Sequence, residues 1–335
     1  MRITRPALLT LVIIGCCIVT VQAQKIGIVT DFKKTTVIDS IIQEMVVEIN
    51  KTTGSARQVT LSSRDIIYQT NTLELAKSNY EQLAPNVDLM ILIGSISAKG
   101  SYSSVLETPT IGLAISDPYL QGLPIINGTS GMKNFTYIWS SVDFAMEIEE
   151  FKRISDFNNL AILVDPGSAI TFNLDAARKS LDSLGQSLST TMNIVPVGDD
   201  ISQSLSSLPP NTDAVYLTEL YGKNQTDIRA IADILKERNL PSFSATKWHV
   251  DSGILGSVSD ENGLDQVIRK LSVIADDALA GEPLDDTPVK ITSREEYFLN
   301  LQTAQEINLS PPFEVIFTAN LIGQNTSSLQ TYSFE

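Results

Sequence analysis

The sequence has almost no cysteine or histidine, the side chains on which much enzyme chemistry depends. Cys16 and Cys17 are its only cysteines, and His249 is its only histidine. Beyond residue 17 a Cys/His metal site therefore has a single histidine and no cysteine to bind the ion, thiol catalysis has no nucleophile, and a histidine-based triad has one candidate base. Gly-x-Ser-x-Gly and the glycine-rich phosphate-binding loops are also absent. We therefore expect no enzyme activity, no metal site and no cofactor, with His249 a packed or surface residue.

Basic residues are scarce as well. The chain has 24 Lys and Arg against 39 Asp and Glu, which gives a net charge of −15, and it has no basic patch. This balance argues against binding to nucleic acid or to anionic lipid, and it favours a freely diffusing protein, which we expect to be a monomer. The paired acids Asp199-Asp200 and Asp285-Asp286 are not part of a series of regularly spaced oxygen ligands such as a calcium-binding loop has, so we expect them in solvated turns.

Long apolar runs are missing except at the start of the chain. Arg2 and Arg5 precede an apolar stretch at residues 7–21, and Val21 and Ala23 place small residues where a signal peptidase cleaves. Residues 1–23 are therefore predicted to be a secretory signal peptide, with the mature protein in the periplasm. The alternative is a lipoprotein anchored through Cys16. No later stretch approaches the roughly 20 apolar residues that span a bilayer.

Removal of residues 1–23 leaves a chain without cysteine. Exported proteins without disulfides are ordinary in the bacterial cell envelope and uncommon in eukaryotic secretion. Asn-x-Ser/Thr sequons begin at residues 50, 127, 134, 224, 308 and 325, and they keep a eukaryotic glycoprotein open, although such a composition also produces them by chance.

The roughly 310 remaining residues are enough for two domains. Two runs, Leu89-Met90-Ile91-Leu92-Ile93 and Thr110-Ile111-Gly112-Leu113-Ala114-Ile115, are apolar at successive positions. Such runs are typical of parallel strands covered by helices on both faces, and these sheets bind ligands at the carboxyl ends of their strands.

Strand and helix patterns alternate along the whole chain, which predicts an α/β fold with two parallel sheets. The first series has expected strands at 25–30, 58–61, 89–93 and 110–115 and helices at 35–50, 73–83 and 98–106. The second has strands at 137–141, 160–164, 192–197, 214–218, 242–245 and 253–258 and helices at 144–154, 169–184, 201–208 and 227–238. A helix at 263–280, strands at 289–292 and 297–301, and a helix at 311–321 follow.

Small polar or turn residues follow most of these strands. In the first series they are Asp31-Phe32, Gly94-Ser95-Ile96-Ser97 and Ser116-Asp117, and in the second Asp165-Pro166-Gly167-Ser168, Thr218-Glu219-Leu220-Tyr221 and Ala245-Thr246-Lys247-Trp248. Two sheets facing each other by their carboxyl edges would gather these residues in one cleft, with hydroxyls and free N–H groups for a small polar molecule. The alternative is that they only cap the helices that follow.

Several segments give the sequence a family resemblance. They are residues 88–95, 109–118, 208–216, 240–244, 279–283 and 299–304, among them Asp-Leu-Met-Ile-Leu-Ile-Gly-Ser, Pro-Thr-Ile-Gly-Leu-Ala-Ile-Ser-Asp-Pro and Leu-Ala-Gly-Glu-Pro. In their order and spacing the chain resembles the substrate-binding proteins of ABC transporters with the periplasmic type I fold, in the branch with tryptophan- and tyrosine-binding members. The resemblance covers nearly all of the chain after residue 23.

The resemblance implies two Rossmann-like lobes joined by a three-segment hinge. The N-terminal lobe would comprise residues 24–140 and about 259–292, and the C-terminal lobe residues 141–258 and about 293–335. By matching position, the ligand would be lined by Ser95, Ile96 and Asp117 from the first lobe and by Asp165, Ser168, Thr218, Tyr221 and Thr246 from the second. Among amino-acid-binding relatives an acid holds the ligand's amine, and here Asp117 or Asp165 would take that role.

We therefore expect a solute receptor of the cell envelope that closes on a small organic ligand, an amino acid or a similar molecule, and presents it to an ABC permease of the inner membrane. The alternative is a ligand-sensing module of the same fold that serves a signalling or regulatory partner. Gene neighbours would separate them, since transport needs a permease and an ATPase.

Overall fold

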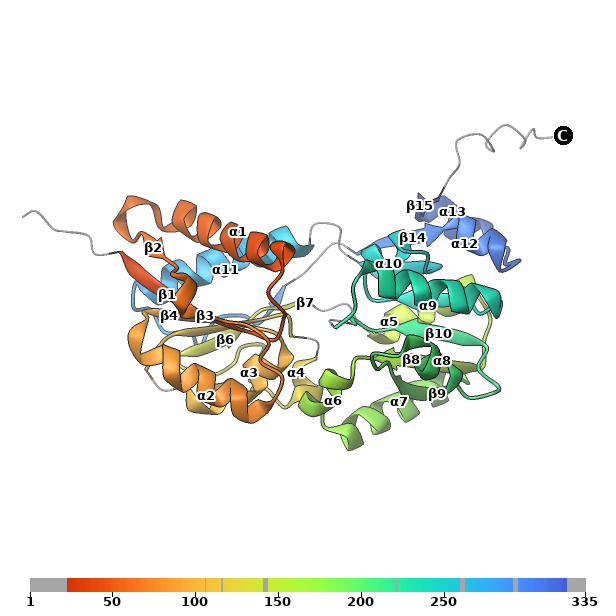
Figure 1. The fold of residues 1–335 in the computed structure, drawn as a ribbon, viewed down its shortest axis with the longest axis horizontal. Coiled ribbons are helices and arrows are strands. Elements are labelled where there is room, and N and C mark those ends of the chain that lie inside the picture. Colours follow the sequence, from red (N-terminus) through yellow and green to blue (C-terminus); the bar gives the residue numbers. More distant parts are fainter. Residues whose placement is uncertain are drawn as a thin grey trace, which may run out of the picture.

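The computed structural model describes residues 23–323 except 106, 116, 141–143, 221, 260–262 and 292–294. The signal segment with Cys16 therefore lies outside the described residues apart from Ala23, and so does Tyr221. Within the described part of the chain, no helix combines the length and the apolar character that a membrane span requires. Figure 1 shows an elongated molecule made of two α/β lobes side by side.

The N-terminal lobe is built on a parallel sheet in the order β2-β1-β4-β5-β6, with β3 also paired to β1. Its strands are β1 (Gln24–Thr30), β2 (Val59–Thr60), β3 (Ile66–Ile67), β4 (Leu89–Ile93), β5 (Thr110–Leu113) and β6 (Phe135–Tyr137). Its helices are α1 (Thr36–Thr53), α2 (Leu73–Leu83), α3 (Ser95–Ser101), α4 (Pro118–Gln121) and α11 (Gly263–Leu279), with short 3-10 turns η1 (Gly54–Ala56), η2 (Ser63–Asp65), η3 (Ala84–Asn86) and η4 (Tyr102–Ser104).

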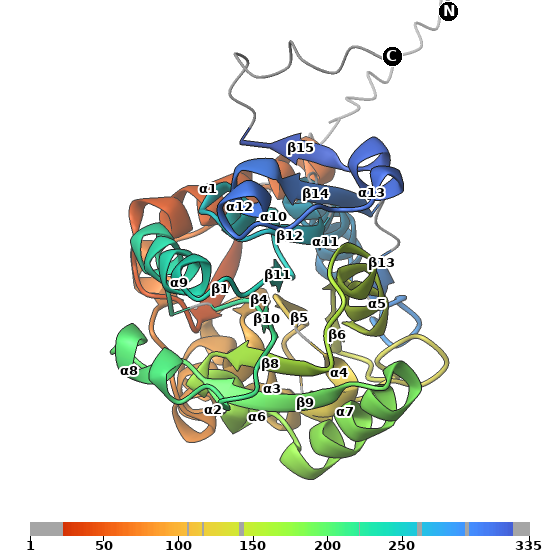
Figure 2. The ribbon, with the colours of Figure 1, turned by 90° about the vertical axis from the view of Figure 1, so that its right-hand side faces the viewer.

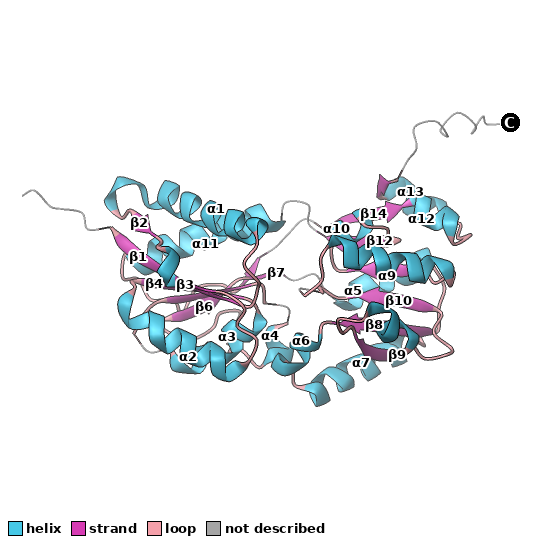
Figure 3. Cartoon of the chain, viewed as in Figure 1, coloured by secondary structure: helices cyan, strands magenta, loops and turns pink. Residues whose placement is uncertain are grey.

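Both faces of this sheet are buried, which explains its continuous apolar strands. Leu89 and Ile91 of β4 pack into a cluster with α1 and α11, whereas Met90 and Leu92 pack on the opposite face with Tyr80 of α2. Alternate side chains of a strand point to opposite faces, so only a strand covered on both sides is apolar throughout. Figure 3 shows the helices above and below the strands.

The C-terminal lobe has a sheet in the order β15-β14-β12-β11-β10-β8-β9. This lobe faces the viewer in Figure 2, with β15 at the top and β9 near the bottom. Its strands are β8 (Asn159–Val164), β9 (Thr191–Pro196), β10 (Ala214–Leu217), β11 (Ser242–Ser244), β12 (Gly256–Ser259), β14 (Glu296–Asn300) and β15 (Asn320–Ile322). Its helices are α5 (Phe144–Ile154), α6 (Pro166–Thr171), α7 (Leu174–Leu188), α8 (Ile201–Ser206), α9 (Gln225–Glu237), α10 (Lys247–Asp251), α12 (Leu301–Glu306) and α13 (Phe313–Thr318). Buried clusters line both faces of this sheet too.

The chain passes between the lobes three times, after Ser140, after Ser259 and after Ile291. Helix α11 returns to the N-terminal lobe, where Leu271 and Ile274 are buried against α1. The short strands β7 (Trp139–Ser140) and β13 (Lys290–Ile291) pair beside these passages. The predicted fold class, two α/β lobes of mostly parallel strands with a three-segment connection, is confirmed; the exact lobe boundaries stay a prediction.

Several elements differ from the expected ones. Strand 137–141, assigned to the second series, is divided between β6 of the first sheet and β7. Strand β14 runs antiparallel to β12. The helix expected at 169–184 is two helices, because Pro166 begins α6 in what we read as a turn, and the helix expected to reach residue 321 ends at Thr318 before β15.

Candidate functional site

The two lobes meet at helices that begin at the carboxyl ends of their sheets. Helix α3 follows β4, helix α6 follows β8, and the two helices contact each other, as do α4 and α7. The main-chain N–H of Asn173 donates to the carbonyl oxygen of Leu120 across this contact, at 2.8 Å. Figure 1 shows α6 between the lobes. The carboxyl edges of the sheets thus face the same region, as the strand-end argument requires.

Ser95 and Ile96 begin α3 and are buried, and Asp31 at the end of β1 holds this helix start. The Asp31 carboxylate accepts hydrogen bonds from the N–H of Ile96 and of Ser97, each at 2.8 Å, and from the Ser97 hydroxyl at 2.5 Å. Burial nevertheless raises the pKa of Asp31 to about 6, since desolvation outweighs these hydrogen bonds. The N–H groups of Ile96 and Ser97, which we expected to be free for a ligand, are therefore taken by the protein's own carboxylate.

Gly94 makes this arrangement possible. Its φ is +118°, and a Cβ at this position would lie 2.2 Å from Oδ2 of Asp31. Only glycine accepts both the backbone conformation and the close carboxylate.

Asp117 and Asp165 have local main-chain partners. Asp117, half-buried, caps α4 by accepting from the N–H of Leu120 at 2.9 Å. One oxygen of Asp165 accepts from Gly167 N–H at 2.8 Å and the other from Gly222 N–H at 3.0 Å, so this carboxylate joins the loops after β8 and β10. For these two acids, the alternative of helix and loop capping accounts for the contacts observed.

The remaining predicted residues follow β8, β10 and β11. Thr218 donates its hydroxyl to the carbonyl oxygen of Leu163 at 3.0 Å, which continues the pairing of β10 with β8. The side chain of Ser168 and all of Tyr221 lie outside the described part of the structure. Thr246 precedes α10, and its Oγ1 is buried without a hydrogen-bond partner among the described residues.

His249 is packed inside the C-terminal lobe and fully buried. Its Nδ1 lies 2.5 Å from Oγ of Ser244, and its Nε2 has no partner among the described residues. Burial lowers the pKa of His249 to about 3, so the ring is neutral at physiological pH. This agrees with our expectation of a packed residue.

Glu219 is a residue that our selection of site candidates missed. It directly follows Thr218 and is half-buried, and burial raises the pKa of its carboxyl to about 7. It lies within the strand-end segment Thr218-Glu219-Leu220-Tyr221, of which only Thr218 and Tyr221 were predicted to line the ligand. Its position at the carboxyl end of a buried strand was the available signal.

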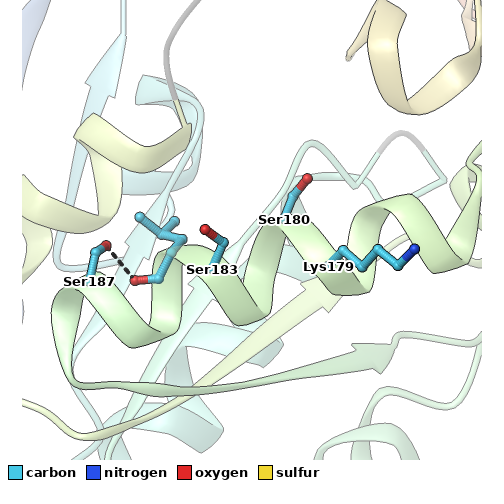
Figure 4. A pocket seen from close by; sticks show the side chains of 5 residues that line it. Lys179, Ser180, Ser183 and Ser187 are labelled. Carbon is cyan, nitrogen blue, oxygen red and sulfur yellow. Dashed lines mark hydrogen bonds between the residues drawn. The ribbon is translucent and has the colours of Figure 1, made fainter.

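The described residues include no group of three or more His, Cys, Asp or Glu side chains that could hold a metal ion. Two open surface depressions lie elsewhere. One runs along α7 and is lined by Lys179, Ser180, Ser183, Leu184 and Ser187, as Figure 4 shows. The other is lined by Lys25, Thr60, Leu61, Ser62, Arg64, Asp65 and Asn86. Neither includes a predicted site residue, and residues of a single lobe line each one, so they do not belong to the region between the lobes.

Comparison with known proteins places the chain in a family. The model of the ABC transporter substrate-binding protein family matches residues 65–321. No curated protein matches the sequence.

Solved structures with the same fold include proteins from three bacteria. An ABC domain from Streptococcus pneumoniae in complex with L-Trp is 20% identical with a TM-score of 0.72. A conserved domain protein from Vibrio cholerae is 15% identical with a TM-score of 0.74. A substrate-binding protein with adhesive properties from Clostridium difficile, in a ligand-free open structure, is 18% identical with a TM-score of 0.61. Each comparison covers 90% of this chain and 99% of the other. The family match over most of the sequence, together with the two-lobed fold, establishes that this chain belongs to the ABC transporter substrate-binding protein family.

Proposed function

We propose that this protein is an extracytoplasmic receptor that closes its two lobes on a small organic molecule, an amino acid or a similar compound, and presents it to an ABC permease. The family match over residues 65–321 carries this proposal. The complex of the Streptococcus pneumoniae structure with L-Trp supports the amino-acid class, because the two chains share their fold along almost their whole length.

The proposed mechanism is ligand-driven closure. A ligand that touches both lobes stabilises the closed state only by contacts that the open state lacks. Ser95 and Ile96 would contribute from one lobe and Thr246 from the other, with Asp117, Asp165, Ser168, Thr218 and Tyr221 completing the lining. The permease would recognise the closed form. No bond of the ligand changes in this cycle, which fits a sequence with one buried, uncharged histidine.

The amino-terminal segment determines where the receptor works. We propose that residues 1–23 direct export and are removed, so that the mature chain begins at Gln24 in the periplasm. Lipid attachment at Cys16 is the alternative, and it would leave residues 16–23 on the mature protein.

Native mass spectrometry of protein purified from a bacterial envelope without refolding tests both whether a small ligand is bound and which residue begins the mature chain. We expect a co-purified small molecule bound to a chain that begins at Gln24. Amino acids added to ligand-free protein should then raise its melting temperature, since a ligand at a hundred times its Kd adds about 2.7 kcal/mol of stability. A chain that carries no adduct and whose melting temperature responds to no candidate solute would overturn the receptor function.

A further inference from the structure

Glu219 belongs to a row of side chains at the carboxyl edge of the C-terminal sheet. Strands β8, β10 and β11 pair in parallel, with Leu163 beside Leu217 and Leu217 beside Ser244. Two residues further along each segment come Asp165, Glu219 and Thr246. Glu219 therefore sits in the middle of this row, at the edge of the sheet that faces the other lobe.

The charged groups near Glu219 have partners of their own, whereas Glu219 has no counter-charge among the residues that the structure describes. Both oxygens of Asp165 accept main-chain N–H groups. Lys247 lies 3.1 Å from Asp251, and Lys223 donates to the carbonyl oxygen of Gly198 at 2.7 Å. Glu219 accepts no hydrogen bond from any residue that the structure describes and forms no ion pair with one. A half-buried acid without a counter-charge is less favourable in its ionised form than one in open water.

The next position in the row gives an independent sign of an unfilled polar site. Oγ1 of Thr246 is inaccessible to water and has no hydrogen-bond partner in the described part of the chain. Buried polar groups are almost always hydrogen-bonded, so the Thr246 hydroxyl, which follows the neighbouring strand β11, is a second polar group at this edge of the sheet whose hydrogen bonding the described residues do not complete.

We propose that Glu219 binds a positively charged ammonium group of the ligand. This inference rests on the proposed function and makes it specific: the receptor takes amines, and Glu219 replaces Asp117 and Asp165 as the acid that recognises them. The ammonium supplies the counter-charge and the hydrogen-bond donors that the described residues do not give to this carboxylate, so closure of the lobes buries a pair instead of a lone charge.

The experiment compares wild type, Glu219→Gln and Glu219→Asp by calorimetric titration at about pH 8. The probes are L-tryptophan, L-tyrosine and L-leucine, each paired with the same acid lacking its amino group: 3-(indol-3-yl)propionate, 3-(4-hydroxyphenyl)propionate and 4-methylpentanoate. Glu237→Gln is the matched control, because it removes one negative charge from an exposed position on the same lobe.

Wild type should bind at least one amino acid and reject its deaminated partner. Glu219→Gln should weaken that binding at least about a hundredfold, the cost of removing one member of a buried charge pair. Glu219→Asp should restore part of the affinity, and Glu237→Gln should match wild type. Thermal unfolding of each free variant excludes loss of fold, and Glu219→Gln should melt no lower than wild type.

The role of Glu219 and the receptor function can fail separately. If wild type binds an amino acid and Glu219→Gln binds it equally well, or if wild type prefers the deaminated compounds, the role of Glu219 is overturned while the receptor function stands. If wild type binds neither these probes nor any co-purified solute, the receptor function falls first.

Discussion

His249 is held uncharged inside the C-terminal lobe, and this makes its contribution to stability depend on pH. Its pKa is about 3 in the folded chain, against an ordinary value of 6.5. The unfolded chain therefore binds a proton more readily, so stability from this residue is complete above pH 6.5 and is lost as the pH falls toward 3. At pH 5 the loss amounts to about 2 kcal/mol.

The variant His249→Asn, which keeps a polar atom near Ser244, should remove this dependence. Urea unfolding of wild type and of His249→Asn gives, for each protein, the change in the free energy of unfolding between pH 7.5 and pH 5. The difference between these two changes measures the contribution of His249. Only that difference is informative, because Asp31 and Glu219 have raised pKa values and change stability in the opposite direction: their contribution grows as the pH falls. An identical change with pH in both proteins would contradict a buried, neutral His249.

The start of α3 depends on Gly94, and a substitution there should show how tightly Asp31 holds the helix. Gly94→Ala combines an unfavourable backbone conformation with a clash against the carboxylate, so we expect a loss of about 3 kcal/mol or more. Gly128→Ala is the control, because Gly128 also has positive φ, +84°, but open space around its Cβ position. Thermal unfolding measures the loss of stability in Gly94→Ala and in Gly128→Ala. Equal losses in the two variants would mean that the contact with Asp31 contributes nothing.

The contact between α3 and α6 offers a second substitution, at Gly167. A Cβ on Gly167 would lie 3.0 Å from Oδ1 of Asp165 in its own loop and 3.7 Å from Cδ1 of Ile96 in the other lobe. A phenyl ring at this position therefore wedges the lobes apart. Gly167→Phe should weaken ligand binding at least about tenfold while thermal unfolding of the free protein changes little, because the side chain enters neither core. Undiminished affinity, measured by the same titration, would show that closure does not use this contact.

Closure itself changes the shape of the entire protein and can be measured in solution. Addition of a bound solute to wild type should lower the radius of gyration from small-angle X-ray scattering, because the two lobes approach each other. Gly167→Phe should show a smaller decrease at saturating solute. A radius of gyration that stays constant in wild type would exclude hinge closure as the mechanism.

Secondary-structure elements whose sequence pattern has a strong physical cause could be predicted from the sequence, whereas elements and site contacts that depend on tertiary packing could not. Strand β4 was predicted at its observed residues, because burial on both faces requires an unbroken apolar run. Strands β3 and β15 were missed because two or three residues at a sheet edge carry no periodicity. In the site, an acid that follows a strand has the same sequence pattern whether it caps a helix, as Asp117 does, or has no hydrogen-bond partner among the described residues, as is the case for Glu219. Only the three-dimensional arrangement distinguishes these cases.

The return of α11 to the first lobe has a consequence for the order of events on the ribosome. Helix α1 leaves the exit tunnel early, yet the cluster that buries its apolar residues Ile42, Met45 and Ile49 is complete only when α11 has been made, near the end of translation. Until then the apolar surface on which α11 packs is exposed to solvent in the nascent first lobe, and the core of this lobe is incomplete. If the chain is exported as proposed above and crosses the membrane unfolded, this delay favours export, since the first lobe needs almost the whole chain to become stable.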